Sequence, residues 1–298
     1  MKPSYVLITP VRNEESTIGI TLESVVRQTN LPAEWVIVSD ESTDRTDEIV
    51  QDYARKYPFI RLLQLAGRPN RSFSSVVFVI EAGISALIYK DYDFIGFLDG
   101  DIRFSEKYYE DIMEKFATNM KLGLAGGLVV DSVNGRYIVN KQSLKEVAGA
   151  VQFFRRECFN SLGGLIAIPE GGWDAITCLQ ARIHGYITQT FPEIQVDHLK
   201  PRNSSEGNII RRFMQLGFRD YSLGNHPVFE TIKCGYRCFE QPYLIGGAIR
   251  FVGYFWSYII RRRRMLSPKI ILQIRREQLA RLFPYQLADI DSIGFTKR

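Results

Sequence analysis

Cysteine is scarce in this chain of 298 residues, and two familiar phosphate-binding glycine motifs are missing. Four cysteines are too few for a disulfide scaffold, and such sparse cysteine is typical of proteins whose thiols stay reduced inside the cell. Neither G-x-G-x-x-G nor G-x-x-x-x-G-K-[ST] occurs, which argues against dinucleotide-binding and P-loop chemistry. The first residues, Met-Lys-Pro-Ser, lack the pattern of a secretory signal, so we expect a cytoplasmic protein.

The composition is that of a folded globular protein. Hydrophobic residues make up 45% of the chain and charged residues 24%, and neither repeats nor low-complexity linkers interrupt it. Disordered and collagen-like classes are therefore excluded. The length allows one large α/β domain or two small domains.

Positive charge is concentrated in the last third of the chain. Residues 1–198 contain 20 Lys and Arg against 26 Asp and Glu, whereas residues 199–281 contain 16 against 5. This split indicates either that the C-terminal part faces something anionic, such as phosphate or a lipid surface, or that it presents a solvated basic face. Because no nucleic-acid-binding motif accompanies these residues, we do not expect a nucleic-acid partner.

Strand-like and helix-like segments alternate over the first hundred residues. The expected strands are 5–9, 35–39, 60–65 and 94–98, and the expected helices are 16–28, 46–57 and 74–89. This alternation predicts an α/β fold with a mainly parallel, Rossmann-like sheet flanked by helices. In such sheets, ligands bind beyond the carboxyl ends of the strands.

The pattern changes after residue 101. We expect helices at 105–119, 173–184, 207–223 and 227–240, a strand at 122–131, and a second strand at 136–140 across an Asn134-Gly135 turn. The C-terminal third is thus expected to be mostly helical.

Asp99 and Asp101 flank a glycine at the point where a buried strand gives way to a turn. Side chains two residues apart project to the same side of an extended chain, and Gly100 lets the backbone bend closely around a ligand. Carboxylates in this arrangement suit Mg²⁺ or Mn²⁺ that bridges phosphate oxygens. An Asp-Gly pair is also common in plain turns, so the metal site and the simple turn remain alternatives.

A second acidic turn, Ser39-Asp40-Glu41-Ser42-Thr43-Asp44, follows the second expected strand. Its side chains could accept hydrogen bonds from a base or a ribose, as acidic residues do at other α/β nucleotide sites. The alternative is a helix entry capped by Asp44 or Thr46, and both can hold at once.

The order of these turns resembles the signature of family 2 glycosyltransferases with the GT-A fold, of the type found in bacterial polysaccharide assembly. The resemblance covers roughly residues 1–200. Its motifs are Thr9-Pro10-Val11-Arg12-Asn13-Glu14, the two acidic turns, Arg155-Arg156-Glu157-Cys158-Phe159 with Gly163-Gly164, Glu170-Gly171-Gly172-Trp173-Asp174 and Val196-Asp197-His198. It implies a GT-A catalytic domain at 1–200, with a nucleotide-sugar-binding half at 1–101 and an acceptor half at 102–200, and a basic, mostly helical extension at 201–298.

The resemblance assigns roles by position. The residues that would bind the nucleotide sugar are Pro10, Arg12, Glu14, Asp40 and Asp99. Asp101 would be the main ligand of Mn²⁺ or Mg²⁺, with Asp99 and His198 as further ligands. A structural histidine is the alternative for His198. The segment before the third expected helix, which contacts the diphosphate in the family, departs from the family pattern here, and Arg68 or Arg71 could supply a positive charge at this place.

Asp174 occupies the position of the family's catalytic base. The family usually has Glu-Asp at this point, whereas Trp173 precedes Asp174 here, so Glu170 is the second choice. Asp174 would take the proton of an acceptor hydroxyl in a single displacement with inversion at the anomeric carbon. The metal would neutralise charge on the departing nucleoside diphosphate.

The implied activity is metal-dependent glycosyl transfer (EC 2.4 class) from a nucleotide-diphosphate sugar donor to a glycan or lipid-linked acceptor, in polysaccharide or cell-envelope glycan biosynthesis. Two alternatives stay open. A sugar-phosphate nucleotidyltransferase would need a glycine-rich basic loop near the N-terminus, where only Arg12 stands. A catalytically silent sugar-nucleotide-binding protein is compatible with the departure at Trp173.

Residues 243–260 form an apolar and aromatic stretch of 18 residues that contains Arg250 and three glycines. Its length is marginal for a membrane span, and four arginines, 261–264, follow at once. Aromatic residues beside a basic cluster suit a peripheral helix on an anionic membrane surface, at the cytoplasmic face. A helix packed on the catalytic domain and a true span are the alternatives.

Overall fold

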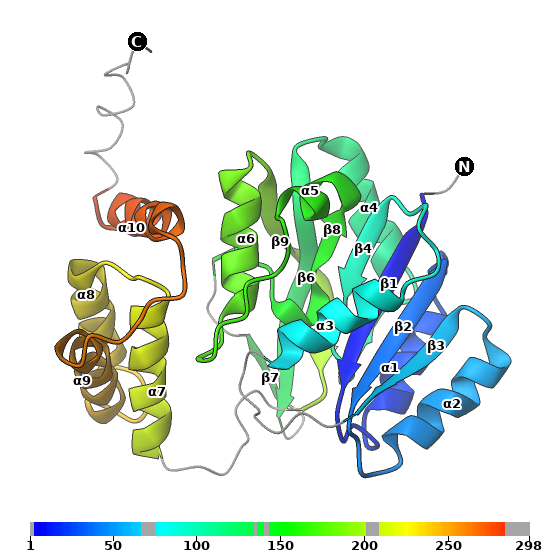
Figure 1. The fold of residues 1–298 in the computed structure, drawn as a ribbon, viewed down its shortest axis with the longest axis horizontal. Coiled ribbons are helices and arrows are strands. Elements are labelled where there is room, and N and C mark those ends of the chain that lie inside the picture. Colours follow the sequence, from blue (N-terminus) through cyan, green and yellow to red (C-terminus); the bar gives the residue numbers. More distant parts are fainter. Residues whose placement is uncertain (1–2, 67–74, 134–135, 140–142, 201–208, 284–298) are drawn as a thin grey trace. The chain divides into compact units, whose positions relative to one another are not determined.

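The computed structural model describes residues 3–66, 75–133, 136–139, 143–200 and 209–283, and it divides the chain into two compact units (Figure 1). The first unit contains Met1–Pro169 and Trp173–Ser204. The second contains Ser205–Arg298 together with the short segment Glu170–Gly172.

The first unit is built on one nine-stranded sheet. Its strands are β1 (Tyr5–Val11), β2 (Glu34–Asp40), β3 (Ile60–Leu65), β4 (Phe94–Phe97), β5 (Ile102–Phe104), β6 (Leu122–Val133), β7 (Arg136–Val139), β8 (Phe153–Arg155) and β9 (Ile187–His198). They lie in the order β3-β2-β1-β4-β8-β6-β9-β5, and β7 pairs with β6 to one side. Strands β1 to β4 are parallel, as the alternation predicts.

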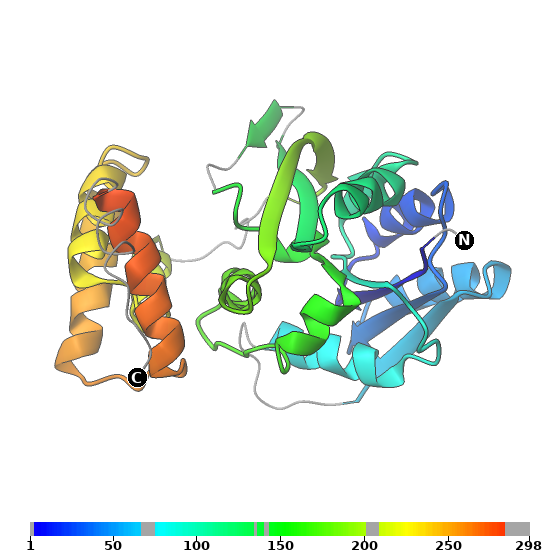
Figure 2. The same cartoon turned by 90° about the horizontal axis from the view of Figure 1, so that it is seen from above.

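Helices cover both faces of this sheet (Figure 2). They are α1 (Ile18–Val26), α2 (Thr46–Lys56), α3 (Ser75–Ala86), α4 (Tyr108–Thr118), α5 (Arg156–Ser161) and α6 (Trp173–Ile183). Alternate residues of a strand point to opposite faces. Leu7 of β1 therefore joins the core beneath α1, α2 and α4, whereas its neighbour Ile8 joins the core beneath α3, α5 and α6.

The second half of the sheet is mixed, and three of its strands were not expected. Strand β8 is antiparallel to both β4 and β6, so β6 runs in the same direction as β4. Strand β9 is parallel to β6 and antiparallel to β5. Strands β5 and β8 have three residues each, which is too short for a periodicity signal. Strand β9 contains Pro192, which is unusual inside a strand, and its pairing with β6 is interrupted there, just after Phe191.

The two strands of the expected hairpin are present and pair with each other. Val133 of β6 pairs with Arg136 of β7 in antiparallel register, as a two-residue connection requires. The turn residues Asn134 and Gly135 lie outside the described part of the chain.

The second unit consists of helices α7 (Ile209–Ser222), α8 (Pro227–Arg237), α9 (Ile245–Ile259) and α10 (Pro268–Leu282). α10 was not expected from the sequence. A proline occupies the first turn of α8 and of α10, where its missing N–H costs nothing. The backbones of α7 and α9 lie in close contact at Gly253: a Cβ added to this glycine would lie 2.6 Å from the carbonyl oxygen of Met214. No helix in the described part of the chain, α9 included, is both long and apolar enough to cross a membrane.

Candidate functional site

Seven of the predicted site residues line one pocket in the first unit, with a volume of about 280 Å³. They are Pro10, Arg12, Glu14, Asp40, Asp99, Asp101 and His198. They lie in or just after β1, β2, β4 and β9, all of which run in the same direction. Because parallel strands bring their carboxyl ends to one edge of a sheet, residues far apart in sequence meet there.

The loops that follow β1 and β2 hold each other in place. Asn13 and Glu41 adopt left-handed backbone conformations, with φ of 53° and 56°, which cost energy in residues other than glycine. Oδ1 of Asn13 accepts the N–H of Thr43 at 2.8 Å, and the N–H of Glu14 donates to Oγ1 of Thr46 at 2.7 Å. These bonds fix the loop that carries Arg12 and Glu14 to the loop that begins directly after Asp40.

Of the two interpretations of the second acidic turn, the structure supports the helix entry, at Asp44, whereas the contact of Asp40 with a base or a ribose stays a prediction. Asp40 lines the pocket. Asp44 accepts the N–H of Thr46 at 3.0 Å and so satisfies a donor at the start of α2. In the first acidic turn, Gly100 does not have a left-handed backbone, and the need for glycine comes from packing, because a Cβ there would lie 2.9 Å from Cγ1 of Val11.

Asp99, Asp101 and His198 form a candidate metal site. Each offers one ligand atom, and these atoms lie within 4.8 Å of one another. Nε2 of His198 lies 3.4 Å from Oδ2 of Asp101. Burial raises the pKa of Asp101, and the opposite charge of His198 only partly offsets this effect. A cation would relieve the cost of the buried charge, so two carboxylates and an imidazole fit a divalent ion such as Mn²⁺.

Asp131 lies behind His198 and was missed at the sequence level. Parallel pairing of β6 with β9 places the two residues side by side, and Nδ1 of His198 lies 3.1 Å from Oδ1 of Asp131. Metal-binding histidines commonly donate their second ring N–H to a carboxylate, which fixes the ring and its tautomer. A usable signal was present, since Asp131 is the last residue of an apolar expected strand, much as Asp40 and Asp99 directly follow theirs.

Lys200 is the second residue that sequence reasoning missed. Its Nζ lies 2.6 Å from Oε2 of Glu14 and donates to the carbonyl oxygen of Asn13 at 3.3 Å. The segment after β9 is thereby tied to the loop after β1. A positive charge also stands beside a pocket lined by four carboxylates: those of Glu14, Asp40, Asp99 and Asp101.

Asp174 lies in the first turn of α6 and is not among the residues that line the pocket. Its Oδ2 accepts the N–H of Gly149 at 3.3 Å. Trp173, which stands where the family usually has an acidic residue, packs into the core with its ring 6.2 Å from that of Phe97. The departure therefore has a structural reason, and the assignment of the base to Asp174 stays a prediction.

Glu170 groups with the second unit. Its Oε1 lies 2.6 Å from Nη2 of Arg262, and its side chain is only 10% exposed. Its place as the second choice for the base stays a prediction. Arg68 and Arg71 lie outside the described residues.

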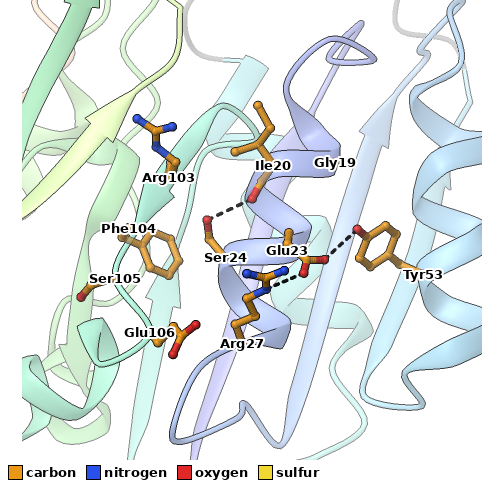
Figure 3. Close-up of a pocket in the computed structure, with 10 residues that line it drawn as sticks. All are labelled: Gly19, Ile20, Glu23, Ser24, Arg27, Tyr53, Arg103, Phe104, Ser105 and Glu106. Atoms are coloured by element: carbon orange, nitrogen blue, oxygen red, sulfur yellow. Dashed lines mark hydrogen bonds and ion pairs between the residues drawn. The ribbon is translucent and has the colours of Figure 1, made fainter.

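A larger hollow of about 500 Å³ lies over α1 (Figure 3). None of the predicted site residues lines it. Hydrogen bonds from Arg27 and Tyr53 occupy Glu23 and lower the pKa of its carboxyl group, and Arg103 is paired with Asp197 outside the hollow. Glu23, Arg27 and Arg103 thus have partners within the protein, and the single further carboxylate of Glu106 gives no basis for assigning a ligand.

Comparison with known proteins gives a family. Residues 6–172 match the model of Glycosyl transferase family 2. The chain is 33% identical over 119 residues to the uncharacterized glycosyltransferase EpsJ of Bacillus subtilis strain 168, covering 40% of this chain and 32% of EpsJ. It is 30% identical over 116 residues to the minor teichoic acid biosynthesis protein GgaB of the same strain, covering 38% of this chain and 12% of GgaB. The chain thus spans a third or less of the length of these relatives.

Solved structures share the fold. The mannosyltransferase PcManGT of Pyrobaculum calidifontis, in complex with GDP-Man and Mn²⁺, superposes with a TM-score of 0.59 at 16% identity, over 97% of this chain and 83% of that one. S. aureus TarS 1–349 in complex with UDP gives 0.55 at 16% identity, over 98% and 75%. These similarities confirm the expected GT-A fold. Since the family model matches more than half of its residues, the chain belongs to glycosyl transferase family 2.

Proposed function

We propose that the chain transfers a sugar, with inversion, from a nucleoside-diphosphate donor to a hydroxyl group of a glycan or lipid-linked acceptor. The observation that carries this proposal is the convergence of seven motif residues on one pocket at the carboxyl edge of the sheet. The residues come from three separate motifs and a distant strand end, so their meeting is not a property of any one turn.

The donor would bind in this pocket. Asp40 would accept hydrogen bonds from the base, Arg12 and Glu14 would line the nucleotide, and Asp99 would reach the ribose or the metal. Asp101, Asp99 and His198 would hold Mn²⁺ or Mg²⁺, with Asp131 fixing the ring of His198. When bound, the cation would neutralise charge that develops on the departing diphosphate.

Asp174 would act as general base. Its carboxylate takes the proton of the acceptor hydroxyl while the acceptor oxygen forms a bond to the anomeric carbon of the donor. The bond between that carbon and the diphosphate oxygen breaks, and its electron pair leaves with the nucleoside diphosphate. The N–H of Gly149 and the amino end of α6 would keep the Asp174 carboxylate in position.

The class of substrate is proposed from the relatives. PcManGT was solved with GDP-Man and Mn²⁺, TarS with UDP and with UDP-GlcNAc, and GgaB is named for minor teichoic acid biosynthesis. UDP-sugars and GDP-sugars are therefore the first donors to test. A cell-envelope glycan assembled at the cytoplasmic face of the membrane is the proposed acceptor class.

A donor panel with two variants tests the proposal. Purified protein is incubated with UDP- and GDP-sugars and Mn²⁺, water takes the place of the acceptor hydroxyl, and release of the nucleoside diphosphate is measured. Asp174→Asn should keep donor affinity within about threefold but lower turnover by about 10²–10⁴, because the amide cannot accept a proton. Asp111→Asn, in the first turn of α4, removes a comparable helix-end charge and should leave turnover unchanged.

Other outcomes would identify another function. Donor binding without turnover for any sugar would favour the catalytically silent binding protein. Release of pyrophosphate from a nucleoside triphosphate and a sugar phosphate would identify a nucleotidyltransferase. Near-normal turnover of Asp174→Asn would move the base to another residue, with Glu170 as the next to replace.

A further inference from the structure

Helix α9 presents its apolar side chains outward and its polar or small ones inward. We call Ile245, Ala248, Val252, Trp256 and Ile259 the outer face; they recur at the three- and four-residue spacing of one helix side and are all exposed. Ile245 is 54% exposed and Ile259 70%. The buried residues of the same helix are Gly246, Gly247, Arg250, Gly253, Tyr254 and Ser257. This distribution is the reverse of that in a helix whose core side is apolar.

The inner side of α9 is fully engaged within the second unit. Nε of Arg250 lies 2.6 Å from Oδ2 of Asp220, which also pairs with Lys233 at 3.1 Å. The hydroxyl of Tyr254 donates to the carbonyl oxygen of Asn225 at 2.5 Å. Asp220 and Arg250 are buried as well as paired, so turning the helix to bury its apolar side would break their ion pair and leave Asp220 without this partner. The outward placement of the outer face is thus built into the packing.

The second unit, which carries the outer face, has an excess of positive charge. Described residues 209–283 contain 14 Lys and Arg against four acidic residues, and two of those acids, Asp220 and Glu230, are buried. Of the four arginines that follow α9, Arg262 is held by Glu170 and Arg264 stacks on the ring of Tyr221 at 4.4 Å. Arg261 and Arg263 are exposed.

We propose that the outer face of α9 docks on an anionic lipid surface, with Trp256 and its neighbours at the level of the headgroups and Arg261 and Arg263 against lipid phosphates. A basic cluster beside an apolar and aromatic face matches the chemistry of such a surface. α9 has 15 residues, about 22 Å at 1.5 Å per residue. That is shorter than the roughly 30 Å of a bilayer core, so the helix lies in the interface and does not span it.

Vesicle binding by the full chain tests the proposal without any donor or acceptor, so the result does not depend on the catalytic proposal. Vesicles of phosphatidylcholine alone and with 30 mole per cent phosphatidylglycerol are spun down with the protein at low and high salt. We expect binding to the anionic vesicles, weakened by salt but not abolished. Fluorescence gives a second readout: of the three tryptophans, Trp35 is fully buried and Trp173 packs partly buried against the core, whereas Trp256 is 46% exposed and should shift to the blue on binding.

Two variants separate the charge from the apolar contribution. Arg261→Ser with Arg263→Ser should weaken anionic binding roughly thirtyfold, as expected for two charges near such a surface. Trp256→Ser with Ile259→Ser should remove the binding that survives high salt. Both pairs are exposed in the structure, so the fold should persist and circular dichroism should be unchanged.

Matched controls come from the first unit. Arg45→Ser with Arg55→Ser removes two equally exposed charges, and Ile88→Ser with Met120→Ser removes two apolar side chains that are 71% and 73% exposed. Neither pair should alter vesicle binding. Trp256→Phe should keep the binding and lose the fluorescence shift.

Three results would overturn the proposal. Wild-type protein that ignores anionic vesicles would mean that the outer face is covered within the chain. A dimer that dissociates on Trp256→Ser with Ile259→Ser, without vesicle binding, would identify a second copy as the occupant. Equal effects of the α9 and control variants would show that binding is non-specific.

Discussion

Replacing Asp131 by alanine should weaken Mn²⁺ binding by about 10- to 100-fold while the protein stays folded. Loss of a carboxylate that orients a metal-bound histidine typically costs this much affinity, about 1.4–2.7 kcal/mol. The site geometry supports the estimate. Nδ1 of His198 lies 3.1 Å from Oδ1 of Asp131, and the two side chains are only 11% and 8% exposed, so solvent screens the interaction little.

The loss should be partial because Asp131 acts through one of three candidate ligands. Asp99 and Asp101 offer their oxygens without it, and Nε2 of His198 stays 3.4 Å from Asp101. What alanine removes is the carboxylate 3.1 Å from Nδ1 of the ring, which would accept the ring N–H and set the tautomer when Nε2 holds the ion. Asp131→Asn keeps an oxygen that can accept the ring N–H, so its affinity should fall between those of the wild type and Asp131→Ala.

The assay is a titration of free Mn²⁺ by electron paramagnetic resonance, with no donor present. Asp197→Asn is the matched control, because Asp197 precedes His198 in β9 but pairs with Arg103 at the surface. It should bind Mn²⁺ as the wild type does. Wild-type affinity in folded Asp131→Ala, or an equal loss in Asp197→Asn, would refute the reasoning.

Two further predictions concern the second unit. Gly217→Ala should lower the free energy of unfolding of this unit by about 1–3 kcal/mol, because the new Cβ would overlap the carbonyl oxygen of Arg250 and lie 2.6 Å from the backbone nitrogen of Tyr254. Gly235→Ala is the control: its Cβ would meet no atom within 4 Å, so it should raise the free energy of unfolding by about 0.5–1 kcal/mol. Burial alone would raise the pKa of Asp220, but Lys233 and Arg250 lower it well below its usual range. The folded state therefore binds this proton less readily than the unfolded state, and stability should fall as the pH drops below about 4.

Urea titrations followed by circular dichroism measure both effects. Gly217→Ala as stable as the wild type would mean that α7 and α9 do not approach as described. Asp220→Asn removes the titrating group and should make the stability depend less steeply on pH in the acid range. An unchanged pH dependence would contradict the ionised Asp220 in the buried network.

The N-terminal half of the fold could be predicted from the sequence because local signals and tertiary structure agree there. Each strand is a short apolar run, each helix is amphipathic, and the expected strand 60–65 has the bounds of β3. Since parallel strands share an edge, the meeting of Asp40 with Asp101 also followed. The order of strands and helices along the chain was therefore sufficient to predict that these two residues lie at the same edge of the sheet.

The rest depended on pairing that no local signal encodes. Asp131 and His198 are 67 positions apart and meet only because β9 lies beside β6 in one register, past an interruption after Phe191. Periodicity shows that a helix has two faces but does not say which one is buried. The glycines and Arg250 of α9 turned out to be inside because α7 and α8 offer backbone and charge partners to them.

The central claim is that the pocket binds a nucleoside diphosphate through a cation held by Asp101. Calorimetric titration of UDP and GDP into the wild type and into Asp101→Asn, with Mn²⁺ and with chelator, tests it most directly. We predict binding of at least one nucleotide by the wild type, with a loss of tenfold or more both on chelation and on Asp101→Asn. Binding of equal strength with chelator, or unchanged metal-dependent binding by Asp101→Asn, would contradict the account.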